Sequence, residues 1–177
     1  TGQTITLSAS QLDEFRKLRE TFPSQRNHTL LRWLAASDFN AEEATSNLQE
    51  HLRWSSVTLP VDTSTVASLV LGDDPVIVRL SHTADDGSAV VKIAARLLPP
   101  PTKESLELCT QAVIWAVESG LRIAEKLSVI YDRSGDTSTS VELDYAKPIV
   151  STLESHYPET LARAYLFPVG GAFRFGA

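Results

Sequence analysis

Hydrophobic positions in the first 60 residues recur at helical spacing. A stripe of apolar residues that ends at Pro23 predicts a first helix: Leu12, Phe15, Leu18 and Phe22. Ser10 and Asp13 have the spacing of a capping box at its start. A second helix is expected over residues 29–36, with Leu30, Leu31 and Leu34 inward, and Asn40 is expected to cap a third. Three short amphipathic helices predict a small helical bundle over residues 1–60.

After Pro60 the pattern changes to short runs rich in β-branched residues. Two such runs, 76–80 and 89–95, flank a turn-forming stretch and predict a β-hairpin. Thr102 is expected to cap a long helix that ends near Lys126. Three further elements are expected after this helix: a buried parallel strand over 127–131, a helix over 144–156 and a strand over 164–167. This order predicts an α/β fold for residues 61–177, with a mixed, largely parallel sheet behind the N-terminal helical bundle.

The composition is that of a globular chain without strong electrostatic partners. Of 177 residues, 42% are hydrophobic and 21% charged, which suffices to bury a core. Residues 1–60 carry 6 basic and 7 acidic side chains, and residues 61–177 carry 10 and 15, which accounts for the net charge of −6. With neither part basic, nucleic-acid binding is not expected. No apolar run approaches the length of a membrane span, and no signal-peptide pattern is present at the start, so a cytoplasmic location is expected.

The search for catalytic chemistry yields little. Neither a nucleophile elbow nor a glycine-rich phosphate loop is present, and the four histidines are scattered without an i, i+4 pair. We therefore expect no enzyme activity, no metal and no cofactor. Cys109 lies on the apolar stripe of its predicted helix, where a buried structural thiol is expected. The segment 132–140 is rich in acids and hydroxyls at the end of a strand, where α/β proteins often bind ligands, but it lacks a complete metal or phosphatase motif.

Several segments in series resemble the CRAL-TRIO family of lipid-transfer proteins. Residues 30–40, LLRWLAASDFN, resemble the LLRFLRARKFD of the family's helical module. Residues 74–78 resemble its GRPV strand, and residues 129–135 resemble the end of its DLKG strand. Residues 156–161, HYPETL, resemble its YPERL motif, and residues 165–173 resemble the segment that follows. The similarity covers roughly residues 29–175 in the family's order.

The resemblance implies a lipid carrier or sensor that encloses one phospholipid or other hydrophobic molecule in an apolar cavity and exchanges it with membranes at their surface. It maps a head-group carboxylate of the family onto Glu159 and two ligand-binding hydroxyls onto Thr137 and Thr139. Tyr131, Phe167 and Phe173 complete the residues expected to bind the ligand. Medium-sized side chains at the expected inward sheet positions, Val76, Val78, Ile93 and Ile130, are expected to leave space for it.

Departures from the family pattern keep an alternative open. Ser37, Asp38 and Thr160 stand where the family has cations, which favours an uncharged ligand or phosphatidylcholine over a phosphoinositide. The family's gate helix and closing elements are not found after Phe173. One side of the cavity is therefore expected to be open and to be covered by a second copy, by a partner chain or by contact with a membrane. The alternative function is a protein-interaction module on the same fold whose lipid pocket is incomplete.

Overall fold

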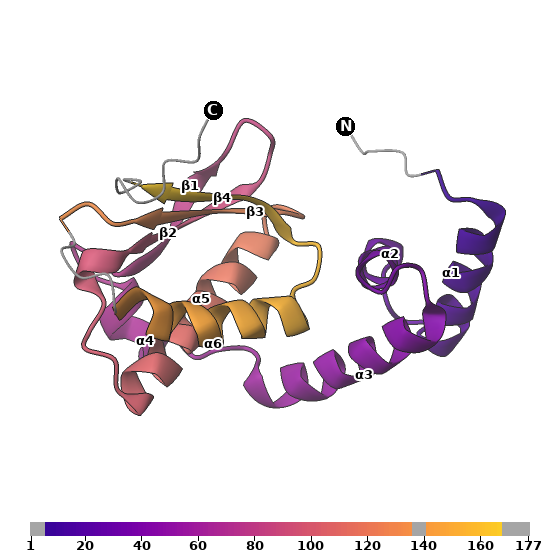
Figure 1. Ribbon diagram of the computed structural model, residues 1–177, viewed down its shortest axis with the longest axis horizontal. Coiled ribbons are helices and arrows are strands. Elements are labelled where there is room, and N and C mark those ends of the chain that lie inside the picture. The colour runs from indigo at the N-terminus through magenta and orange to yellow at the C-terminus, as the bar shows by residue number, and fades with distance from the viewer. Residues whose placement is uncertain (1–5, 136–140, 168–177) are drawn as a thin grey trace. The chain divides into compact units, whose positions relative to one another are not determined.

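A computed structural model describes residues 6–135 and 141–167 (Figure 1). The chain divides into two compact units, Thr1–Leu59 and Pro60–Ala177. Unit 1 is helical, and unit 2 combines helices with a four-stranded sheet. Each unit is described by itself below.

The described part of unit 1 contains three helices, α1 (Ala9–Thr21), α2 (Asn27–Ala36) and α3 (Ala41–Thr58). The expected cap at Ser10 is wrong. Ser8 caps α1, because its hydroxyl accepts from the Gln11 N–H while the Gln11 side chain accepts from the Ser8 N–H. A glutamine closes this box as well as an acid does, so the helix begins two residues earlier than expected. Asn40 caps α3 as expected, accepting from two backbone N–H groups.

The core of unit 1 is built from the inward faces of all three helices. Its buried members are Leu18, Leu30, Trp33, Leu34, Ala41, Ala44 and Leu48. The expected helical stripes reach the core with two departures, the first of which is Leu12 at the start of α1, which is 38% exposed. Trp33 is buried, whereas Leu31, which was expected to point inward, is only half-buried.

Within its described residues, unit 2 has four helical segments and four strands. They are α4 (Thr63–Val70), β1 (Ile77–Thr83), β2 (Ala89–Ala94), the short 3₁₀ helix η1 (Ala95–Leu97), α5 (Lys103–Leu121), β3 (Leu127–Asp132), α6 (Val141–His156) and β4 (Leu161–Phe167). Thr102 caps α5 as expected. Helix α4 was not predicted, and it begins at a side-chain cap in which the Asp62 carboxylate accepts from the Ser64 N–H. Helix α5 ends five residues earlier than predicted, directly after Gly120, a poor helix former.

The strands lie in the sheet in the order in which they occur in the sequence, β1-β2-β3-β4. β1 and β2 form the expected antiparallel hairpin, and β2, β3 and β4 are parallel. The mixed, largely parallel α/β sheet is therefore confirmed. Both crossovers, through α5 and α6, step in the same direction, so right-handed connections place both helices on one face of the sheet. Figure 1 shows α4, α5 and α6 gathered beneath that face.

Packing of α5 identifies the covered face. Gly120 lies directly over the sheet, since a Cβ built on it would be 3.3 Å from the Ala89 Cβ and 2.5 Å from a methyl carbon of Leu127. Val91, two residues after Ala89, is also buried. Because side chains alternate along a strand, residues in register with Ala89 and Val91 form this helix face, and the intervening residues form the opposite one, here called the open face.

Candidate ligand-binding face

The open face is assembled from alternate residues of all four strands. Across the sheet, Val78, Lys92, Ile130 and Tyr165 stand in one row. Toward the amino ends of the parallel strands the next row is Val90, Ser128 and Arg163, and toward their carboxyl ends it is Ala94, Asp132 and Phe167. Among the described residues of unit 2, no helix lies over this face (Figure 1).

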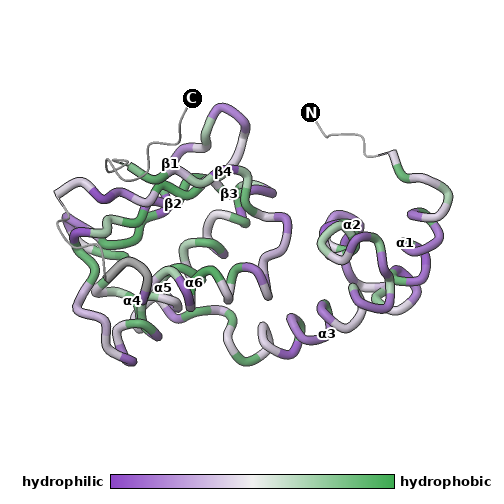
Figure 2. The backbone as a smooth tube through the Cα atoms, in the orientation of Figure 1, coloured by the Kyte–Doolittle hydropathy of each residue, from purple (hydrophilic) through white to green (hydrophobic). Residues whose placement is uncertain are grey.

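Apart from Lys92, the middle of the open face is apolar. Val78 and Ile130 are half-buried, and the rings of Tyr165 and Phe167 are 47% and 63% exposed. Figure 2 shows hydrophobic residues concentrated in the strands and in α5, whereas α1 and α3 are mostly hydrophilic. Apolar side chains in contact with water on both inner and edge strands form a surface that can bind another apolar molecule.

An ion pair borders this band toward the carboxyl ends of the strands. Lys92 Nζ lies 2.8 Å from a carboxylate oxygen of Asp132. The Ser134 N–H donates to the other carboxylate oxygen at 2.9 Å. The hydrogen bond from Lys92, followed by those from Ser134, holds the pKa of Asp132 well below its usual range. The Asp132 carboxylate is therefore ionised at neutral pH, and it neutralises the charge of the Lys92 side chain with which it is paired.

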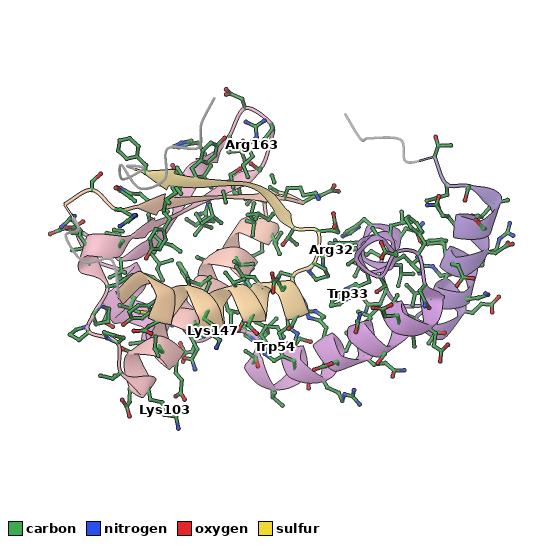
Figure 3. The ribbon with its side chains drawn as sticks, in the orientation of Figure 1. Arg32, Trp33, Trp54, Lys103, Lys147 and Arg163 are labelled. Atoms are coloured by element: carbon green, nitrogen blue, oxygen red, sulfur yellow. The ribbon has the colours of Figure 1, made fainter. Side chains whose placement is uncertain are left out.

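A hydrogen-bonded chain borders the band toward the amino ends. The Ser88 hydroxyl is 2.6 Å from Asp86 Oδ1, and it lies 2.7 Å from the hydroxyl of Ser128. Because an ionised carboxylate only accepts, Ser88 donates to Asp86, and Ser128 must then donate to Ser88. Arg163 Nε lies 3.2 Å from the second oxygen of Asp86. Figure 3 shows Arg163 on the side of the sheet away from α5 and α6.

Neutralised charges define what this face can bind. The two cations that the strands place on it, Lys92 and Arg163, each have a carboxylate partner, Asp132 and Asp86 respectively. Bonds from Ser88 lower the pKa of Asp86, so that this pair also stays ionised at neutral pH. An anionic ligand would have to compete with a carboxylate for either cation. The arrangement instead fits an apolar molecule with a neutral or zwitterionic polar end.

The expected ligand-binding residues are only partly brought together. Phe167 lies on the open face, but Tyr131 is in register with Ile93 and Leu166 on the helix face. Thr137, Thr139 and Phe173 lie outside the described residues. Among the expected inward positions, Val78 and Ile130 share the open face, whereas Ile93 lies on the opposite one. The expectation of a single pocket wall is therefore wrong at Ile93, because its alternation with Lys92 sends it toward α5.

Glu159 stands at the other end of the sheet from Phe167. It lies between α6 and β4, with an exposed side chain and a positive φ of 57°. Its backbone carbonyl accepts a hydrogen bond from Lys126 Nζ. The seven residues of β4 separate it from Phe167 by roughly 20 Å, at about 3.3 Å per residue. The two residues cannot contact the same ligand head group.

Sequence reasoning missed the polar residues that border the open face. Ser88 and Ser128 are 2% and 1% exposed, and Ser128 lies within the run of otherwise apolar residues that begins β3 and precedes Asp132. A signal was present in the hairpin turn, since Asp86 followed two residues later by a serine is typical of a carboxylate that accepts from the backbone of its own turn. Pairing between this turn and Arg163, which lies 77 positions further along, had no signal in one sequence.

Cys109 and the side chains at the start of α3 have structural roles. Cys109 is buried as expected, and burial raises the pKa of its thiol to about 11, so it is protonated and unreactive at neutral pH. A hollow at the start of α3 is lined in part by Glu14 and Asn40, which already bind the backbone N–H groups there. Within residues 6–135 and 141–167 no group of three or more acids, histidines or cysteines is placed to hold a metal. The helices in these ranges include none long and apolar enough to cross a membrane.

Comparison with known proteins adds no assignment. The chain matches no protein-family model, and no curated protein matches it in sequence.

Proposed function

We propose that this chain is a carrier or sensor that binds one hydrophobic ligand against the open face of its sheet and exchanges it at membrane surfaces. The observation that carries the proposal is the apolar band of that face, which both right-handed crossovers leave without a helix. The resemblance to CRAL-TRIO proteins supports the same function, because their ligands occupy an apolar cavity in the α/β lobe.

The electrostatics of the open face favour a ligand without net charge. Lys92 and Arg163 are each paired with a carboxylate, so on the open face of the described strands a phosphoinositide would find no cation without an anionic partner. Phosphatidylcholine, whose head group is zwitterionic, and neutral sterol-like molecules fit better. The net charge of −6 further disfavours long-range attraction to anionic leaflets. Membrane contact by this chain would then depend on apolar side chains, not on basic ones.

Native mass spectrometry of protein purified from cells, followed by lipid extraction, tests the proposal directly. We expect one phospholipid or neutral lipid bound per chain. A protein that carries no ligand, and that takes none up from phosphatidylcholine vesicles, would contradict the proposal and favour the interaction module.

Two adjacent residues of β4 provide a matched pair of variants. Phe167→Asp places a charge on the open face, and Leu166→Asp places the same charge on the helix side of the same strand, where Leu166 is 39% exposed. We expect Phe167→Asp to reduce lipid uptake at least about tenfold, because desolvating a charge against an apolar ligand is costly. Leu166→Asp should change it little. Equal effects of the two substitutions would show that the open face is not the binding surface.

A further inference from the structure

β4 differs from the other strands in its exposure. All seven of its residues are exposed, whereas β2 has five of six buried. Apart from Arg163, its side chains are apolar or aromatic, including Leu161 at 55% and Phe167 at 63% exposed. β4 also stands at the end of the strand order, so in the described residues its outer edge has no neighbouring strand. Long apolar edges of this kind are templates for pairing with another chain.

The opposite edge of the sheet is protected in a way that β4 is not. β1 carries Arg79 and ends in Ser81, His82 and Thr83, and its pairing with β2 is irregular between Arg79 and Thr83. Charges, polar residues and bulges are the features by which edge strands avoid association. β4 has one bulge, at its start beside Leu127, and none over its last five residues. Any strand pairing by this sheet is therefore expected at β4.

Backbone hydrogen bonds show which groups of β4 are available. The Arg133 N–H donates to the carbonyl of Phe167, so Phe167 directs its backbone groups toward β3. Backbone groups alternate in direction along a strand, so Tyr165 and Arg163 also face β3. Ala164 and Leu166 therefore direct their N–H and C=O groups outward, away from the sheet.

We propose that β4 pairs antiparallel with β4 of a second copy of this chain. A two-fold axis through the pair would bring outward-facing residues opposite one another, either Ala164 opposite Ala164 or Ala164 opposite Leu166. In the first register Arg163 lies opposite Tyr165 of the other copy, and in the second it lies opposite Phe167. Both place the one charge of the strand against an aromatic ring, a favourable cation–π partner, and neither opposes two arginines.

This pairing extends the sheet to eight strands and leaves the ligand face accessible. An axis perpendicular to the sheet keeps the open faces of both copies on the same side, where the two apolar bands become continuous. The sequence led us to expect a partner that covers the open side. In this proposal the second copy instead joins the edge of the sheet and leaves the open side uncovered. The inference does not depend on the proposed lipid function, since it rests on the backbone and side chains of β4 alone.

Sedimentation velocity of the whole chain over a range of micromolar concentrations tests the proposal. We expect a reversible dimer. Ala164→Pro removes an N–H that points away from β3, so it should leave the β3–β4 pairing intact and weaken dimerisation at least about tenfold. Leu166→Lys should do the same by placing a charge at the edge. Val150→Lys, at a 48% exposed position of α6, is the control and should leave the dimer unchanged.

Three results would overturn the proposal. They are a wild-type chain that remains monomeric at the highest concentration, a dimer that persists in both β4 variants, and a monomer whose Ala164 and Leu166 amides are protected from hydrogen exchange. The last would show that another segment of the same chain occupies the edge. If Ala164→Pro fails to fold by circular dichroism, Leu166→Lys decides alone.

Discussion

The direction of the hydrogen bonds between Ser128, Ser88 and Asp86 makes a quantitative prediction. Ser88 is predicted to donate to the carboxylate and accept from Ser128. Ser128→Ala therefore removes one neutral hydrogen bond while the Ser88 donor stays occupied, at a cost of about 1 kcal/mol. Ser88→Ala removes this bond and also the hydrogen bond to the Asp86 carboxylate, and it leaves the Ser128 hydroxyl, 1% exposed, without its acceptor. A hydrogen bond to a charged group contributes about 1.5–3 kcal/mol and an unsatisfied buried donor costs about 1–2 kcal/mol, so this variant should lose at least about 3 kcal/mol.

The double variant sharpens the test. Removing both hydroxyls leaves no buried donor, so Ser88→Ala/Ser128→Ala should be more stable than Ser88→Ala alone, although it has lost more atoms. Hydrogen exchange of peptides from β2 and β3 is the appropriate assay, because the chain has two compact units and a global unfolding signal would mix them. Equal costs for the single variants, or a double variant less stable than both, would refute the assigned direction.

Three further predictions concern packing, backbone strain and pH. Gly120→Ala should lower the stability of unit 2 by about 1 kcal/mol or more, because overpacking against Ala89 outweighs the helix propensity gained near the end of α5. A rise in the urea midpoint of unfolding would contradict this prediction. Glu159→Gly should raise stability by about 0.5–1 kcal/mol in thermal unfolding, because it relieves a positive φ at an exposed residue. The pKa values of Asp132 and Asp86 are lowered in the folded state, so these groups stabilise the fold at pH values above their unfolded pKa of about 3.9. This stability should be lost as the pH falls below that value. A urea midpoint that stays constant through this range would contradict the two ion pairs.

The order of elements was predictable because the local signals for it are strong. Asn40 and Thr102 cap their helices as their side chains predict, and the run from Leu127 forms the expected parallel strand. Boundaries failed where two signals competed. Ser8 and Ser10 are both suitable caps, and only the Gln11 side chain, which closes the box with Ser8, distinguishes them.

The site was less predictable, since it depends on which residues share a face. Tyr131 and Phe167 both end strands in the sequence, yet pairing places them on opposite sides of the sheet. A shift of one residue in register would reverse this result, and hydrophobic pattern alone does not fix the register of strands that are apolar at most positions. The partners of Arg163 were beyond prediction for the same reason, because Asp86 reaches it only through the β1–β2 turn.

Topology explains why the open face, and not a crevice between strands, is the candidate site. Doubly wound α/β proteins bind ligands where the strand order reverses, because the crossovers on either side of that point depart to opposite faces and leave a crevice. Here the parallel strands follow the sequence order from β2 to β4, so both crossovers go to one face and no reversal exists among them. The helices that would have formed the second wall of a crevice instead complete the core beneath the sheet. The apolar residues that these helices do not cover lie on the open face and in β4. A ligand bound to the open face and a second chain paired with β4 would each bury apolar surface that the described fold exposes to water.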